Sequence, residues 1–80
     1  MSVTVLLFAS YADALGTSSL SMALPPGATV GDVLADLRRH PGADRLPASP
    51  LVAVNASYAT LETAVQPGDE VAVIPPVAGG

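Results

Sequence analysis

Residues 30–37 carry the strongest periodic signal in the chain, and this signal restricts the fold. Their apolar residues fall at positions i, i+3, i+4 and i+7, which is one stripe along a helix: Val30, Val33, Leu34 and Leu37. Such a helix needs another element on which to bury its stripe. In a chain of 80 residues, we therefore expect an α+β, two-layer domain with one main helix packed on one face of a sheet.

Both ends of this helix are marked in the sequence. Thr29 is the expected N-cap, because Asp32 follows it at capping-box spacing. Pro41 and Gly42 should end the helix. The intervening residues 38–40, Arg-Arg-His, are expected in the last turn, where cations suit the helix dipole.

The segments around the helix are typical of short strands. We expect strands at residues 2–8, 17–24, 51–55 and 70–74, with a brief one around Tyr58. Between the first two strands, Ser10 is expected to cap a short helical turn that Gly16 closes. The predicted order is two strands, the one main helix, and then two or three further strands.

Alternation along the first and last strands indicates what the uncovered face carries. Val3, Val5 and Leu7 share one face of the first strand, and Thr4 suggests that the alternate residues point outward. When the same alternation is applied to both strands, four apolar residues fall on the outer face and form a patch: Leu6, Phe8, Ala72 and Ile74. Either loops cover this patch, or it binds a partner.

Composition excludes several classes of function. The chain has no cysteine, which rules out disulfides, thiolate metal sites and cysteine nucleophiles. Its net charge of −4, with three arginines and no lysine, does not suit nucleic-acid binding. No segment is typical of a signal peptide or a membrane span, so we expect a cytoplasmic protein with a basic protein partner.

The side chains offer no clear catalytic group. His40 is the one histidine and is expected to be a solvated cation at a helix end. Asp69 and Glu70 are adjacent acids, but their PGDE context predicts a solvated turn. No metal cluster or phosphate loop is present, and so the unusual group that remains is the chain end.

The last residues have the properties of a tail that another enzyme activates. Pro75 and Pro76 favour an extended backbone and forbid a helix. Val77 and Ala78 follow, and then Gly79 and Gly80, whose missing Cβ atoms allow the backbone into a narrow channel. The terminal carboxylate on Gly80 is unhindered and is the predicted reactive group.

Three stretches of the chain are similar to a known family: LFASYADALG (7–16), VAVN (52–55) and PGDEVAVIPPVAGG (67–80). The chain resembles the small, sulfur-carrying subunits of molybdopterin synthases, in the MoaD/ThiS group of ubiquitin-like β-grasp proteins. The resemblance implies a mixed-sheet β-grasp domain over residues 1–75 and an extended, flexible tail over residues 76–80. Members often carry an arginine in the first short helix, where this chain has Tyr11 and Ala12.

The resemblance also implies a mechanism in which partners supply the catalytic residues. An adenylyltransferase similar to ubiquitin-activating enzymes would use ATP to adenylate Gly80, and a sulfur donor would convert it to a thiocarboxylate. The tail would then enter the large subunit of molybdopterin synthase and deliver sulfur to cyclic pyranopterin monophosphate. The chain itself would bind no cofactor. Phe8 and Ile74 match hydrophobic contact positions of the family, and Tyr58 matches a third.

Two alternatives remain open at this point. The chain could carry sulfur for thiamin or cysteine biosynthesis, although the PPV before the diglycine favours molybdopterin. It could instead be a ubiquitin-like modifier joined to lysines of target proteins, in which case its lack of lysine would keep it a single tag.

Overall fold

The structure is a computed structural model that describes residues 1–47 and 50–75. Along these residues run five strands, two α-helices and a short 3-10 helix, η1. In chain order they are β1 (Ser2–Leu7), α1 (Ala9–Leu15), β2 (Ser19–Ala23), α2 (Val30–Leu37), η1 (Ala43–Arg45), β3 (Leu51–Val54), β4 (Ser57–Ala59) and β5 (Glu70–Ile74).

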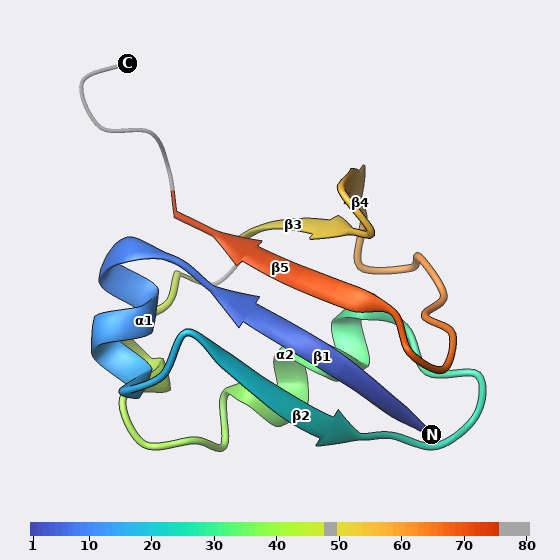
Figure 1. The fold of residues 1–80 in the computed structure, drawn as a ribbon, viewed down its shortest axis with the longest axis horizontal. Coiled ribbons are helices and arrows are strands. Elements are labelled where there is room, and N and C mark those ends of the chain that lie inside the picture. Colours follow the sequence, from blue (N-terminus) through green and yellow to red (C-terminus); the bar gives the residue numbers. More distant parts are fainter. Residues whose placement is uncertain (48–49, 76–80) are drawn as a thin grey trace.

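The five strands form one sheet in the order β2-β1-β5-β3-β4 (Figure 1). β1 and β5 pair in parallel, with Val5 opposite Val71, whereas the other three strand pairs are antiparallel. The predicted mixed sheet and the α+β architecture are therefore confirmed. Because β1 and β5 run the same way, both deliver the chain to the same end of the sheet.

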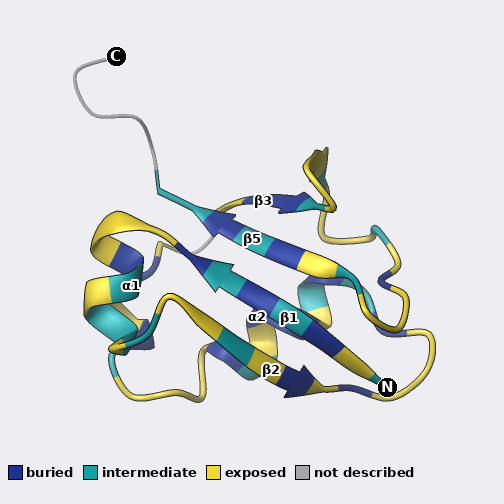
Figure 2. Cartoon of the chain, in the orientation of Figure 1, coloured by how far each residue is buried: buried dark blue, intermediate teal, exposed yellow. Residues whose placement is uncertain are grey.

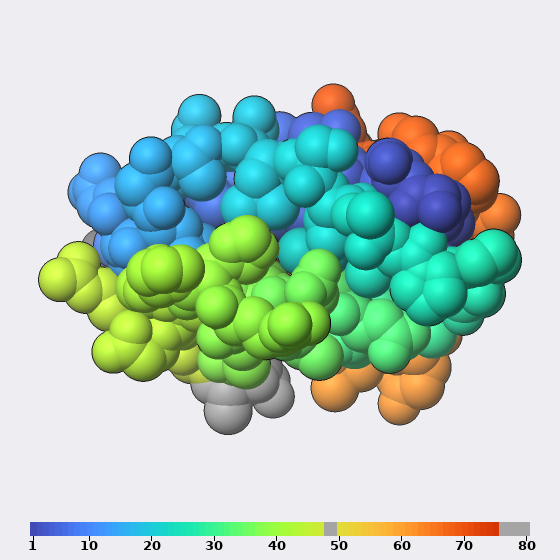
Figure 3. Space-filling view, turned by 90° about the horizontal axis from the view of Figure 1, so that it is seen from below, coloured from blue at the N-terminus to red at the C-terminus, as the bar shows by residue number. Residues whose placement is uncertain are grey.

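Helix α2 covers one face of this sheet and lies behind it in Figure 1. Its capping box forms as predicted, with the Thr29 amide donating to Asp32 Oδ2 at 2.9 Å and the Asp32 amide donating to Thr29 Oγ1. The apolar stripe is buried in one core with the inner faces of the two central strands: Val3, Val5, Val71 and Val73. Figure 2 shows this alternation along β1 and β5, and in the view of Figure 3 the green residues of the segment that contains α2 lie below the blue residues near the N-terminus.

The segment between β1 and β2 differs from the prediction. It is a seven-residue α-helix, α1, and not only a helical turn. Phe8 occupies the N-cap position without a side-chain hydrogen bond, so the prediction that Ser10 caps this segment was wrong. Tyr11 is buried, which indicates that packing stabilises the helix in place of a cap. Gly16 closes it in the left-handed conformation, as predicted.

The end of α2 also differs from the prediction. The helix ends at Leu37, and no basic residue lies in its last turn. The chain tightens here, since the amides of Arg39 and His40 donate to carbonyls three residues back. Gly42 then adopts a φ of 90°, and a Cβ atom built on it would lie 1.9 Å from the Ala14 carbonyl oxygen. Glycine at this position therefore lets the segment that follows α2 approach α1 closely.

Burial of the α2 stripe leads to a test of the core. Leu34 is 5% exposed, so Leu34→Ala should lower the free energy of unfolding by about 2–5 kcal/mol through lost contacts and a cavity. Leu61 is 50% exposed and provides the matched control, because Leu61→Ala should cost less than about 1 kcal/mol. Urea denaturation followed by circular dichroism measures both values. Equal losses for the two variants would contradict the described core.

Candidate functional site

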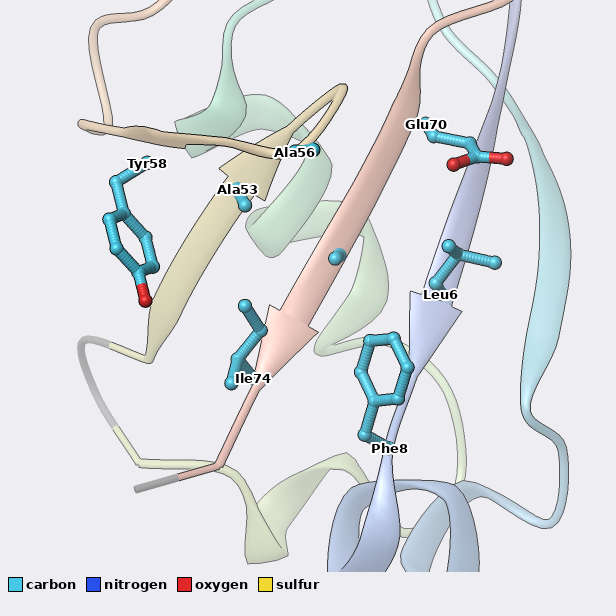
Figure 4. A pocket seen from close by; sticks show the side chains of 8 residues that line it. Leu6, Phe8, Ala53, Ala56, Tyr58, Glu70 and Ile74 are labelled. Carbon is cyan, nitrogen blue, oxygen red and sulfur yellow. The ribbon is translucent and has the colours of Figure 1, made fainter. Parts of the chain in front are cut away.

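The face of the sheet that α2 leaves uncovered carries an open, largely apolar groove (Figure 4). Residues from β1, β3, β4 and β5 and from the β3–β4 turn line it, so it spans four of the five strands. The lining residues are Leu6, Phe8, Ala53, Ala56, Tyr58, Glu70, Ala72 and Ile74. All four residues that strand parity assigned to an outer apolar patch are among them, and no described loop closes over the groove.

Alternation along β1 and β5 produces this surface. Val5 and Val71 are fully buried against α2, whereas their neighbours Leu6 and Ala72 are half-buried and point the other way. Phe8 follows β1 and remains 46% exposed. A one-residue change of register would bury these outward residues and expose the valines, so burial of the valines fixes the position of the groove.

Phe8 and Ile74 lie at the same end of the groove. Leu7 pairs with Val73 in the parallel register of β1 and β5, so the residues that follow each of them emerge side by side. Figure 4 shows the two side chains at this end. Pro75 comes next in the chain and is the last described residue. The apolar anchors predicted from the sequence thus lie next to the point where β5 delivers the chain to residues 76–80.

Tyr58 forms the opposite wall of the groove. It lies on β4 opposite Ala53, and its side chain is 77% exposed. The intervening turn has positive φ at Asn55 and Ala56, 49° and 71°, which suits the twist of a tight β-hairpin. The hairpin therefore raises an aromatic ring beside a floor made of the small residue Ala53.

Four residues of this surface were not predicted from the sequence: Leu51, Ala53, Ala56 and Glu70. Leu51 pairs with Ile74 across β3 and β5 and is 46% exposed, so it extends the apolar surface beside Ile74. The alternation Leu-Val-Ala-Val in β3 holds a signal for Leu51 and Ala53, which share one face. Glu70 begins β5, as the predicted strand over residues 70–74 requires, but its carboxylate was interpreted as part of a solvated turn entering that strand, whereas the residue lines the groove.

A hydrogen-bond network supports the end of the groove at which β5 begins. The Asp69 carboxylate accepts from the Gln66 amide at 2.8 Å and from Asn55 Nδ2 at 2.9 Å. These two bonds, the backbone one first, lower the pKa of Asp69. Asn55 Oδ1 in turn accepts from the Glu70 amide at 3.0 Å. The network therefore joins the β3–β4 turn to the start of β5.

Most of the remaining predicted site residues lie outside the described part of the chain. Pro75 is described and half-buried, but Pro76, Val77, Ala78, Gly79 and Gly80 are not described, and neither is the predicted tail conformation. His40 is exposed. Residues 1–47 and 50–75 contain no group of three or more His, Cys, Asp or Glu side chains placed to hold a metal ion. Within the same residues, no helix has the length and apolar character needed to cross a membrane.

Comparison with known proteins adds an independent line of information. The model of the ThiS family matches residues 5–80. A molybdopterin synthase sulfur carrier subunit of Chlamydomonas reinhardtii is 35% identical over 100% of this chain and 100% of its own. The structure of small archaeal modifier protein 1 of Haloferax volcanii is 32% identical, covers 95% of this chain and 98% of its own, and superimposes with a TM-score of 0.85.

A second similar structure is a protein–protein complex. It contains subunits 1 and 2 of the molybdopterin-converting factor of Helicobacter pylori 26695, and its matching chain has a TM-score of 0.76. Coverage is 100% of both chains, but the identity is 22%, so this similarity concerns the fold. The neighbours confirm the predicted ubiquitin-like β-grasp fold.

The lowered pKa of Asp69 leads to a prediction of pH dependence. Hydrogen bonds favour the ionised carboxylate in the folded state, so its stabilising effect is present above the unfolded-state pKa and is lost as the pH falls through the lowered folded-state pKa. Asp69→Asn should therefore be less stable than the parent at neutral pH, and the difference should shrink in acid. Urea denaturation at a series of pH values measures it. A pH-independent difference would contradict the described network.

The position of Ile74 leads to a test of the groove. Ile74→Asp places a carboxylate at the apolar end and should weaken binding of the large subunit expected from the resemblance by more than about tenfold, because apolar anchors dominate such interfaces. Leu61→Asp changes an exposed leucine outside the groove and is the matched control. Calorimetric titration measures the affinity, and circular dichroism checks the fold. Normal binding by Ile74→Asp would exclude the groove as the interface.

Proposed function

Because this chain belongs to the ThiS family, we propose that it acts as the sulfur-carrier subunit of a molybdopterin synthase. The observation that carries the proposal is the match to a molybdopterin synthase sulfur carrier subunit along the full length of both chains. The groove supports it, since an apolar surface beside the end of β5 suits a protein partner that must also receive residues 76–80.

The chemistry proposed for the tail takes place at the Gly80 carboxylate. Attack of this carboxylate on the α-phosphate of ATP, in the active site of an activating enzyme, forms an acyl-adenylate and releases pyrophosphate. Sulfide (HS⁻) supplied by a sulfur donor then attacks the acyl carbon and AMP leaves, which gives a thiocarboxylate. In this proposal, ATP is a substrate of the activating enzyme, and the chain contributes only the group that is activated.

The proposed second stage is delivery of sulfur. The thiocarboxylate enters the large subunit and transfers its single sulfur to cyclic pyranopterin monophosphate, and water then hydrolyses the remaining acyl group back to the Gly80 carboxylate. Because a dithiolene holds two sulfur atoms, two such transfers are needed to form molybdopterin. Catalytic residues come from the large subunit, so the chain acts by binding and by presenting the sulfur. The groove supplies binding energy close to the tail, which holds the reacting atom in place and lowers the entropic cost of the reaction.

A modifier function is the second candidate, and one observation favours it. The similarity to small archaeal modifier protein 1 is close in both fold and sequence. A modifier would use the same adenylated Gly80, but a lysine amine of a target protein would attack it and form an isopeptide bond. The two functions differ in the nucleophile, and so the products separate them. Sulfur carriage for thiamin or cysteine biosynthesis would differ from the proposed function only in the molecule that accepts the sulfur.

The tail chemistry gives a direct test of this function. Deletion of Gly80 withdraws the carboxylate by about 3.3 Å in an extended chain, and a misplacement of about 1 Å can already cost a hundredfold in rate. Deletion of Gly80, or Gly79→Val, should therefore abolish formation of the thiocarboxylate and of molybdopterin. Ala78→Gly adds no side chain and should remain active. Intact-mass spectrometry after incubation with activating enzyme, ATP and a sulfur donor should show one oxygen replaced by sulfur.

Other products would contradict the proposal in different ways. Isopeptide adducts on lysines of other proteins would establish the modifier function. Molybdopterin synthesis by the Gly80 deletion variant would refute a reaction at the chain end. Both measurements require that the variants and the parent unfold at the same urea concentration. A loss of activity then cannot be due to unfolding of the variant.

A further inference from the structure

Glu70 is the one charged residue among the eight that line the groove. It begins β5, whereas Ile74 ends this strand, so the carboxylate and the apolar anchors lie about 13 Å apart along the groove at the usual rise per residue. Figure 4 shows the Glu70 side chain beyond Leu6, away from Phe8 and Ile74. The groove therefore has an acidic end and an apolar end.

One residue, Asn55, forms hydrogen bonds to both the amide and the carbonyl group of Glu70. Asn55 Oδ1 accepts from the Glu70 amide at 3.0 Å, and the Asn55 amide donates to the Glu70 carbonyl at 2.8 Å. In the register of β1 and β5, Glu70 also lies opposite Thr4. The side chain thus extends over the groove from an anchored position and not from a loose turn.

The Glu70 carboxylate is exposed, and within residues 1–47 and 50–75 it makes no hydrogen bond or ion pair. Its sequence neighbour Asp69 differs, because the Asp69 carboxylate is occupied by Gln66 and Asn55. All three arginines lie between residues 38 and 45, in the segment that follows α2, away from the strands that line the groove. As far as the structure describes the chain, this carboxylate is therefore left to the solvent.

We propose that the Glu70 carboxylate forms an ion pair with an arginine or lysine side chain of the large subunit, and that this pair fixes the direction in which the partner docks. The inference rests on the proposed function. A partner that covers the apolar groove also removes water from Glu70, and a carboxylate that loses water without gaining a cation strongly disfavours the complex. The net charge of −4 favours a basic partner surface as well.

The consequence for specificity follows from the two different ends. An apolar side chain of the partner fits between Phe8 and Ile74, and the cation fits beside Glu70, so a partner docked in the reverse direction meets a mismatch at both ends. The correct direction places the opening of the partner's active site next to Pro75, where the tail begins. Glu70 is thus a specificity-determining residue that does not touch the reacting atoms.

Two variants of Glu70 and one matched control test this inference. Glu70→Gln keeps the shape but removes the charge, and it should weaken binding of the large subunit by about tenfold, mainly through faster dissociation. Glu70→Arg places like charges together and should weaken binding by more than about a hundredfold. Glu62→Gln removes the same charge from an exposed residue outside the groove and should change the affinity by less than about twofold. Surface plasmon resonance at several salt concentrations measures the rates.

Each outcome has a distinct meaning. A loss confined to the Glu70 variants, with a weaker salt dependence for Glu70→Gln, supports the ion pair. Equal effects of Glu70→Gln and Glu62→Gln would show that only net charge matters and would overturn it. Parent-like binding by Glu70→Gln, while Ile74→Asp fails to bind, would overturn the ion pair and leave the proposed function intact. Failure of the parent protein to bind the large subunit would refute the proposed function and this inference with it.

Discussion

The parallel pairing of β1 with β5 is the contact on which the site depends. It joins an early segment of the chain to a late one at the centre of the sheet, with Val5 opposite Val71 and Leu7 opposite Val73. Because the two strands run in the same direction, Phe8 and Ile74 emerge together, and Pro75 leaves the domain beside them. An antiparallel pairing of the same strands would place these residues at opposite ends. Burial of the central valines thus also positions the residues that we propose bind the partner.

The open groove follows from the use of one covering helix. α2 buries the inner face of the sheet, and within the described residues no second layer covers the outer face. The outer face is apolar at its rim, where Phe8, Leu51 and Tyr58 are exposed, and its centre is floored by the small residues Ala53 and Ala72. Large residues around a small-residue floor make a concave surface. Such a surface can bury apolar area on a partner without a rearrangement of the domain.

Much of this arrangement could be predicted from local patterns. Alternation located the buried valines and the outward Phe8 and Ile74, and the Thr29–Asp32 spacing located the start of α2, because these features depend on neighbouring residues alone. The cap of α1 was predicted wrongly, since burial of Tyr11 replaces a capping hydrogen bond there. The proposed role of Glu70 and the pairing of Leu51 with Ile74 depend on strand register, which links residues far apart in sequence. Local patterns carry no information on such pairings.

The position of β5 in the sheet has a consequence for biosynthesis. β5 is the last of the described strands in sequence but a central one in space, and its neighbours β1 and β3 each pair with it but not with each other. During translation, the central pairings of the sheet therefore form only after β5 has left the ribosome. The pairing of β1 with β5 then closes a loop that contains nearly all of the described chain. A nascent or truncated chain that lacks β5 has neither a complete core nor the groove. Assembly of the binding surface therefore requires that synthesis of the chain has reached the end of β5.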